Sequence, residues 1–255
     1  MFTHNAGAEI ERALPALTPS VQFPVLICVL CYGPHAKLAR RFLQSLYGNT
    51  SPSLFVLRAG LNEVESATYR LFAEYADRFG NVELFIESKN VFKNPLMRRM
   101  FREKPIPSNW TIWCDDDTHF IRPDWLLRLA LRIEASPEAV MWGPIHALWR
   151  KDNEILEWIQ QAPWFKGIPF RKGRNFDGSR AVEFRFAQGA FWAIRTKVLH
   201  QLDWPDPRLI HACEDFILGE ALRQNSFRIE GFNYGVKVND SPRRNPDAHP
   251  VSSGP

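Results

Sequence analysis

The first third of the chain alternates between short apolar runs and helical patterns, and this alternation constrains the fold most. The apolar runs occupy residues 24–31, 54–57 and 82–86. Each has the length and the β-branched content of a buried strand. The stretches between them repeat apolar residues with helical spacing, and the second, from Ser66 to Phe79, ends at Gly80 as its C-cap. This order predicts an α/β fold with a doubly wound, mostly parallel sheet flanked by helices.

A fourth apolar run, residues 110–114, leads into three consecutive carboxylates, Asp115, Asp116 and Asp117. Like charges this close repel one another, and a protein core does not hold them unpaired. If the chain stays extended, Asp115 and Asp117 point to the same side, where their oxygen atoms suit Mg²⁺ or Mn²⁺. Residues 123–127 predict a helix, so we expect the carboxylates in a strand-to-helix loop, where open α/β sheets bind ligands. A solvated acidic turn that caps this helix is the simpler alternative.

Positive charge lies just before the acidic triplet. The segment 90–102 begins at Asn90 and carries the basic residues Lys93, Arg98, Arg99 and Arg102. Cations close to the carboxylates could hold the phosphates of a nucleotide. Scattered Lys and Arg residues also commonly form a solvated helix face, and this interpretation stays open.

Two later stretches add candidate site residues. Gly189 follows an alternating strand pattern over residues 181–186 and indicates a close approach of the backbone to a ligand or to another strand. Glu214 and Asp215 open a helix whose apolar stripe follows them. Acidic residues in a first turn commonly complement the helix dipole, but a carboxylate there can also act as a general base.

The segment 152–180 combines aromatic and basic residues with three glycines. It could shape an acceptor site, close as a lid over a bound ligand, or be a variable surface loop.

Composition sets the outer limits. A chain of 255 residues with 45% hydrophobic residues and a net charge of +4 is typical of a globular protein, not of a dedicated nucleic-acid binder. Four cysteines are too few for a secreted disulfide framework, and the longest uncharged apolar run, residues 25–32, cannot span a bilayer. We therefore expect a cytoplasmic protein without an integral membrane segment. Its expected organisation is an extension over residues 1–22, one domain over 23–240 and a tail over 241–255.

Three stretches in this order resemble the metal-dependent glycosyltransferases of the GT-A fold. They are residues 110–120 (WTIWCDDDTHF), residues 188–194 (QGAFWAI) and residues 214–219 (EDFILG). The acidic triplet with Thr118 resembles the fringe-type enzymes, and the first strand and helix are more similar to the family 2 enzymes. The resemblance implies a GT-A-like single domain, with a Rossmann-like nucleotide-sugar-binding half over residues 23–120 and an acceptor half over 121–240.

The resemblance also implies roles for individual residues. Asp117 and Asp115 would bind Mn²⁺ or Mg²⁺ as the DXD motif, Asp215 would activate the acceptor with Glu214 beside it, and His249 would be a further metal ligand. The nucleotide-sugar would be bound by Asp115, Asp116, Lys93, Asn90, Arg98, Tyr32 and Gly189.

The expected function is transfer of a hexose-like sugar from a nucleoside diphosphate-sugar, such as a UDP-sugar, to an acceptor hydroxyl, with inversion. The acceptor class stays open between a glycan, a lipid, a protein and a hydroxylated nucleic-acid base. One alternative is a nucleotidyltransferase acting on sugar phosphates, although a clear Gly-rich signature after the first strand is missing. The other is a non-catalytic module that binds glycan or nucleic acid through the segment 152–180.

Overall fold

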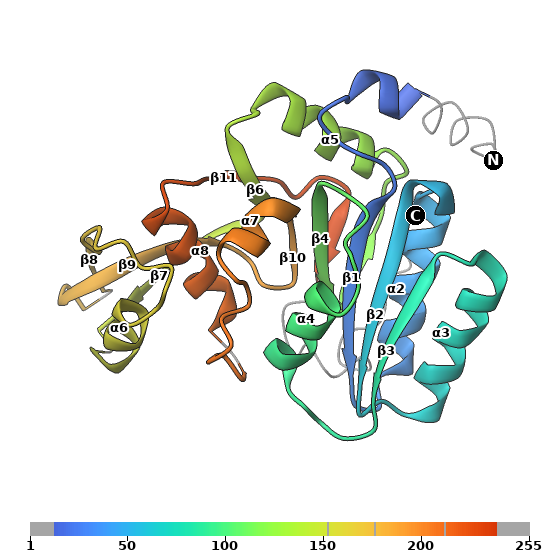
Figure 1. Cartoon of the computed structure of the whole chain (residues 1–255), viewed down its shortest axis with the longest axis horizontal. Helices are drawn as coiled ribbons and strands as arrows, with labels where there is room; N and C mark the ends of the chain where they lie inside the picture. The colour runs from blue at the N-terminus through green and yellow to red at the C-terminus, as the bar shows by residue number, and fades with distance from the viewer. Residues whose placement is uncertain (1–12, 152, 176, 212, 239–255) are drawn as a thin grey trace.

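The computed structural model describes residues 13–151, 153–175, 177–211 and 213–238, and its centre is a seven-stranded sheet (Figure 1). The strands follow the spatial order β11-β6-β10-β4-β1-β2-β3. Their bounds are β1 (Val25–Tyr32), β2 (Phe55–Asn62), β3 (Val82–Glu87), β4 (Trp110–Asp115), β6 (Ala139–Gly143), β10 (Phe191–Arg195) and β11 (Arg228–Gly231). β10 is antiparallel to both of its neighbours, and the remaining pairs are parallel. The expected mostly parallel sheet is therefore confirmed.

β1 lies inside the sheet between β4 and β2, and helices cover it on both faces. Ile27 and Val29 pack into one apolar cluster, while Leu26 and Leu30 pack into the other. Because side chains alternate along a strand, a strand that is buried on both faces reads as a continuous apolar run. This explains why the sequence of β1 lacks the alternation of a half-exposed strand.

The helices divide between these two faces (Figure 1). α2 (Ala36–Asn49), α3 (Ser66–Phe79) and α5 (Trp125–Ala135) contribute to the cluster that contains Ile27. α4 (Lys93–Arg102), α7 (Thr196–Gln201) and α8 (Glu214–Gln224) contribute to the cluster that contains Leu26. Gly80 ends α3 in the left-handed conformation, with a φ of 69°, as the sequence predicts for a C-cap glycine.

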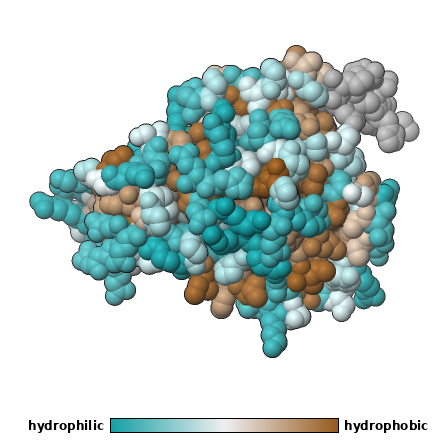
Figure 2. Space-filling view, in the orientation of Figure 1, coloured by the Kyte–Doolittle hydropathy of each residue, from teal (hydrophilic) through white to brown (hydrophobic). Residues whose placement is uncertain are grey.

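The segment 152–180 contains regular structure and is more than a loop. It holds α6 (Asn153–Gln160) and β8 (Arg171–Arg174). β8 joins β7 (Ile145–Arg150) and β9 (Arg180–Ala187) in an antiparallel sheet of order β7-β9-β8. This outer sheet extends from one end of the molecule, and most of the surface shown there is hydrophilic (Figures 1 and 2). The strand character of β8 depends on pairing with β9, which a local sequence pattern does not reveal.

Small elements complete the structure around the main sheet. β5 (Thr118–Phe120) pairs with β12 (Val236–Val238), and a 3₁₀ turn, η1 (Pro52–Leu54), precedes β2. Residues 13–17 are helical, and the Ser20 hydroxyl donates to Glu134 on α5 over 2.9 Å. No helix among the described residues is both long and apolar enough to cross a bilayer.

Candidate functional site

The candidate site lies at the point where the strand order of the sheet reverses. The chain moves from β1 outward to β2 and β3, and then returns to form β4 on the other side of β1. β1 and β4 are parallel, with Leu30 opposite Asp115, so both strands end at the same edge. In open α/β sheets the crevice beyond such a switch point is where ligands bind. The acidic triplet is located at this edge, as the sequence predicts.

The triplet does not continue as an extended strand. Asp115 is the last residue of β4, Asp116 and Asp117 form a turn, and Thr118 begins β5. The triplet therefore lies in the connection from β4 to α5, as expected. The extended geometry that would point Asp115 and Asp117 to the same side is absent, and the connection contains β5, which pairs with β12. The turn is anchored on the carbonyl oxygen of Ala190, which accepts from the Asp115 N–H over 2.9 Å and from the Thr118 hydroxyl over 2.7 Å.

All three carboxylates are buried. The exposed fractions are 5% for Asp115 and 1% for both Asp116 and Asp117. The indole N–H of Trp113 donates to Asp115 Oδ1 over 3.2 Å. A solvated acidic turn, the simpler alternative from the sequence, does not fit this burial, because buried carboxylates require compensation by cations and hydrogen-bond donors.

Lys93 joins the two acidic stretches that the sequence singles out. Its ammonium lies 2.9 Å from Asp115 Oδ1 and 2.7 Å from Glu214 Oε1. Burial alone would lower the pKa of Lys93, but the carboxylates of Asp115 and Glu214 raise it above its ordinary value. The structure therefore connects β4 with the first turn of α8 through one charged lysine.

Both residues that precede this ion pair have strained backbones. Phe92, before Lys93, has a φ of 66°, and Cys213, before Glu214, has a φ of 65°. Such conformations cost about 1–3 kcal/mol in non-glycine residues and persist where the surroundings impose them, often at functional sites. The two loops are also joined directly, because the Asn94 N–H donates to the Ile210 carbonyl over 3.3 Å.

Glu214 and Asp215 have different surroundings despite being neighbours. Glu214 is buried and paired with Lys93, whereas Asp215 is partly exposed. Burial first and the nearby Glu214 second raise the pKa of Asp215 above its ordinary value, against the N–H of Phe216, which donates to Oδ1 over 2.8 Å. Asp215 is therefore the more accessible of the two carboxylates.

At Gly189 the backbone approaches another segment closely, as the sequence indicates, and that segment is the first turn of α8. A Cβ atom at position 189 would lie 3.3 Å from the Asp215 Cβ and 3.4 Å from Glu214 Oε1. The loop between β9 and β10 thus packs directly against both carboxyl side chains.

The remaining predicted site residues have different positions in the structure. Asn90 Oδ1 accepts from Asn62 Nδ2 over 2.9 Å and from the Phe92 N–H over 2.8 Å, so Asn90 shapes the loop that carries Lys93. Tyr32 ends β1 and is 38% exposed. His249 lies outside the described residues.

Arg98 has a different partner from the one that the sequence suggests. Its guanidinium binds the carboxylate of Asp203 over 2.9 and 3.0 Å and the carbonyl oxygen of Pro205 over 2.7 Å. Arg98 therefore fastens α4 to the chain after α7 and has its donors directed away from the acidic triplet.

Sequence reasoning missed Arg41 and His119. Arg41 on α2 is buried, and its guanidinium donates to the Asp117 carbonyl over 3.0 Å. Burial lowers the pKa of Arg41, and the carboxylates of Asp117 and Asp116 oppose this shift. His119 on β5 is 6% exposed, and burial, together with the charges of Arg41 and Lys237, lowers its pKa to about 4. The position of Arg41 within the apolar stripe of α2 was the available signal.

The donor chemistry of the triplet fits a divalent cation. Within the described ranges, no three His, Cys, Asp or Glu side chains lie close enough to hold a metal by themselves. Mg²⁺-like cations are commonly bound by one or two carboxylates, with substrate phosphates completing the coordination. Asp115, at the end of β4, and Asp117, in the turn that follows, match this incomplete type of site.

Comparisons with known proteins agree with this geometry at the level of the fold. No family model matches the chain, and no curated protein matches it by sequence. The mannosyltransferase PcManGT from Pyrobaculum calidifontis, solved with GDP-Man and Mn²⁺, superposes with a TM-score of 0.61 at 12% identity, over 96% of this chain and 67% of that one.

Two further solved structures are similar over shorter fractions of their length. S. aureus TarS gives a TM-score of 0.54 at 12% identity, over 82% of this chain and 58% of that one. GalNAc-T7, solved with UDP, GalNAc and Mn²⁺, gives 0.58 at 13% identity, over 81% of this chain and 41% of that one. This chain therefore spans about half the length of these two proteins. The chain has the fold of the GT-A glycosyltransferases.

Proposed function

We propose that this protein is a metal-dependent glycosyltransferase that transfers a sugar from a nucleoside diphosphate-sugar to an acceptor hydroxyl. The observation that carries the proposal is the convergence of three segments at the switch point: the acidic triplet, Lys93 and the Glu214-Asp215 pair. The GT-A fold supports it, because two of the similar structures, PcManGT and GalNAc-T7, were solved with GDP-Man or UDP and with Mn²⁺. A UDP-sugar is the first donor to test.

On the donor side, Asp117 and Asp115 would hold Mn²⁺ or Mg²⁺. A bound divalent cation neutralises negative charge on a departing diphosphate. Lys93 places a second positive charge beside Asp115, within a site that excludes most water, where electrostatic stabilisation is strong. Asn90 would hold the Lys93 loop in place, and Tyr32 would offer an aromatic surface at the end of β1 to the nucleotide base.

On the acceptor side, Asp215 would act as the general base. It would take the proton from the acceptor hydroxyl while that oxygen bonds to the anomeric carbon and the bond from this carbon to the diphosphate breaks. The raised pKa and the partial exposure of Asp215 suit this role. Glu214 suits it less, because its carboxylate is engaged by Lys93. A positioned base suits direct displacement, so we expect inversion at the anomeric carbon.

Hydrolysis of the donor without acceptor provides the test. The purified chain is incubated with a panel of nucleoside diphosphate-sugars in Mn²⁺ or in EDTA, and the released products are separated and quantified. The proposal predicts slow release of nucleoside diphosphate and free sugar in Mn²⁺ and none in EDTA.

The same experiment separates the alternatives. Release of a nucleoside monophosphate with sugar phosphate would indicate chemistry at the phosphorus atom, as in a nucleotidyltransferase. Ligand binding without any turnover, with or without acceptor hydroxyls, would indicate a non-catalytic binding module.

A further inference from the structure

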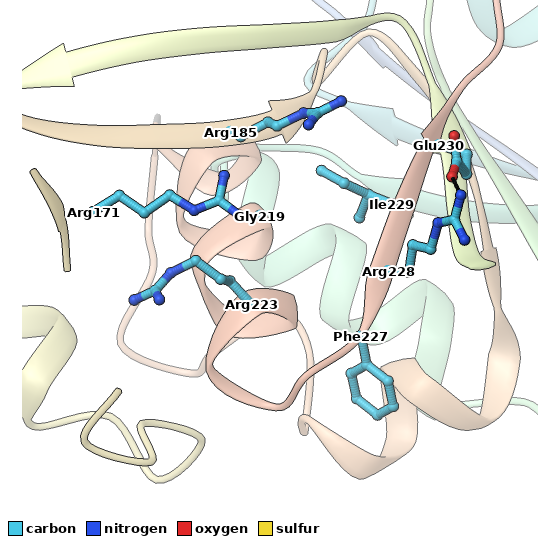
Figure 3. A pocket seen from close by; sticks show the side chains of 8 residues that line it. All are labelled: Arg171, Arg185, Gly219, Arg223, Phe227, Arg228, Ile229 and Glu230. Atoms are coloured by element: carbon cyan, nitrogen blue, oxygen red, sulfur yellow. Dashed lines mark ion pairs between the residues drawn. The ribbon is translucent and has the colours of Figure 1, made fainter. Parts of the chain in front are cut away.

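A cavity away from the acidic triplet lies between α8, the outer sheet and β11. Its volume is about 310 Å³. Figure 3 shows the side chains that line it, with Arg171 on β8, Arg185 on β9, Gly219 and Arg223 on α8, and residues 227–230 before and within β11. Half of its eight lining residues are arginines, an accumulation of like charge that is unfavourable without an anion.

Two of these arginines are neutralised by carboxylates within the protein. Arg228 pairs with Glu138 over 2.6 Å and also with Glu230. Arg223 pairs with Glu220 over 2.7 Å. These ion pairs fix both guanidinium groups at the rim of the cavity.

The other two arginines have no such compensation. Among the described residues, neither Arg171 nor Arg185 has a carboxylate partner. Both side chains belong to the outer sheet, from neighbouring strands, and both line the same cavity. Four arginines against the three carboxylates Glu138, Glu220 and Glu230 leave about one positive charge in excess at the cavity, and the two uncompensated guanidinium groups favour an anion such as a phosphate monoester.

The backbone around the cavity is held by a close contact between α8 and β9. A Cβ atom at position 219 would lie 2.4 Å from the Arg185 carbonyl oxygen and 2.6 Å from the Phe186 Cβ. Gly219 thus lets the helix rest directly on the strand. The spacing between Arg185 and Arg223 is consequently set by packed secondary structure and not by flexible loops.

This cavity is separate from the switch-point site. β11 runs parallel to β6, and Arg228 begins it at the amino end of the strand, whereas Asp115 is at the carboxyl end of β4. Along α8, Asp215 is in the first turn and Arg223 near the last, which corresponds to about 12 Å of helix axis at the standard rise.

We propose that this cavity binds a phosphorylated small molecule, with the phosphate between Arg171 and Arg185 and the organic part against Phe227 and Ile229. Guanidinium groups present paired N–H donors that match phosphate oxygens. The volume is at the lower end of the range for small-molecule sites, so it accommodates more than a bare phosphate ion. This assignment does not depend on the glycosyl transfer proposed above.

Calorimetric titration of the full chain tests the assignment. The titrants are a hexose 6-phosphate, inorganic phosphate and the uncharged hexose, at constant ionic strength and in EDTA, so that metal-assisted binding at the switch point does not contribute. We expect saturable binding of the hexose 6-phosphate, weaker binding of inorganic phosphate and none of the hexose. Equal affinity for both phosphates would instead assign the cavity to the free ion, and absence of saturable binding would overturn the proposal.

Substitutions locate the binding. Arg171→Gln combined with Arg185→Gln should weaken hexose 6-phosphate binding by about tenfold or more, because charge-assisted hydrogen bonds are lost. Lys172→Gln is the matched control, since Lys172 is an exposed cation on β8 whose side chain alternates to the other face. If the double variant folds poorly, the single variant Arg171→Gln is titrated in its place. Unchanged affinity in these arginine variants, or an equal loss in the control, would show that the cavity is not the site.

Discussion

Helix α4 has a cation of low exposure at each end, and the two cations are held in different ways. At its carboxyl end, Arg58 from β2 donates to the carbonyl oxygens of Met100 over 2.7 Å and Pro105 over 2.6 Å, and it pairs with Glu83. At its amino end, Lys93 lies between Asp115 and a carboxylate of α8. Arg58 is 1% exposed, and the Lys93 side chain is 15% exposed.

The helix dipole explains the difference. Backbone carbonyl groups attract a cation at the carboxyl end of a helix, whereas the amino end repels one. Arg58 is therefore satisfied mainly by the backbone of the fold itself. Lys93 occupies the unfavourable end and depends on Asp115 and Glu214, the side chains we assign to the site. The comparison separates a cation held mainly by the backbone from one held by carboxylates of the proposed site.

The largest effect should follow from a change in the acidic triplet, which includes the Lys93 partner Asp115. Asp117→Asn replaces a charged metal ligand with a neutral amide, so Mn²⁺-dependent nucleotide binding should be abolished while the fold is retained. Titration with a nucleoside diphosphate in Mn²⁺ measures this, and Asp124→Asn, later in the same connection, is the control. Binding of wild-type strength by the Asp117 variant would remove Asp117 from the metal site.

A change at the carboxyl end should alter stability and leave the chemistry intact. Arg58→Met leaves Glu83 and several carbonyl groups without their donor, so the free energy of unfolding should fall by about 3–5 kcal/mol. Denaturant unfolding measures the loss, and turnover per folded molecule should stay unchanged. A stable variant with lost turnover would reverse the roles of the two cations.

The third prediction separates catalysis from helix capping at α8. Asp215→Asn should keep donor affinity and lower turnover by about 10²-fold, the usual scale for loss of a general base. In the wild type, the raised pKa of Asp215 should shift the acidic limb of the rate profile above the ordinary range of an aspartate, because the base must be ionised. A variant that is less stable by about 1 kcal/mol yet fully active would instead indicate a dipole role and leave Glu214 as the candidate base.

The smallest expected effect on turnover comes from the loop between β9 and β10, which packs against Glu214 and Asp215. Gly189→Ala adds a Cβ at 3.3 Å from the Asp215 Cβ, so it should displace the site slightly and reduce turnover by about tenfold. Gly48→Ala, where an added Cβ meets nothing within 4 Å, is the control and should leave turnover unchanged. Equal turnover in the two variants would mean that the packing at Gly189 does not position Asp215.

The sequence predicted elements whose signal is local. The apolar run of β1 and the pattern of α3 lead directly to a parallel sheet, and the triplet after β4 marks the edge where we propose the site. The sequence did not predict which side of α4 each basic side chain would face, and therefore which partner it would bind. Lys93 and Arg98 give the same compositional signal, but five residues along a helix rotate the second to another side, where it binds Asp203.

Contacts between distant segments were also hidden from the sequence. Glu214 and Lys93 meet only because α8 and α4 cover the same face of the sheet. Arg41 was open to prediction, since it interrupts the apolar stripe of α2. β8 was not, because its short basic sequence becomes a strand only beside β9.

Thermal unfolding of the wild type with nucleotides tests the central claim most directly. A ligand that binds only the folded state raises the unfolding midpoint. The account predicts that at least one nucleoside diphosphate or its sugar raises the midpoint in Mn²⁺ and that EDTA removes the increase. No increase with any nucleotide in Mn²⁺, or an increase that persists in EDTA, would contradict a metal-dependent nucleotide-sugar site at the acidic triplet.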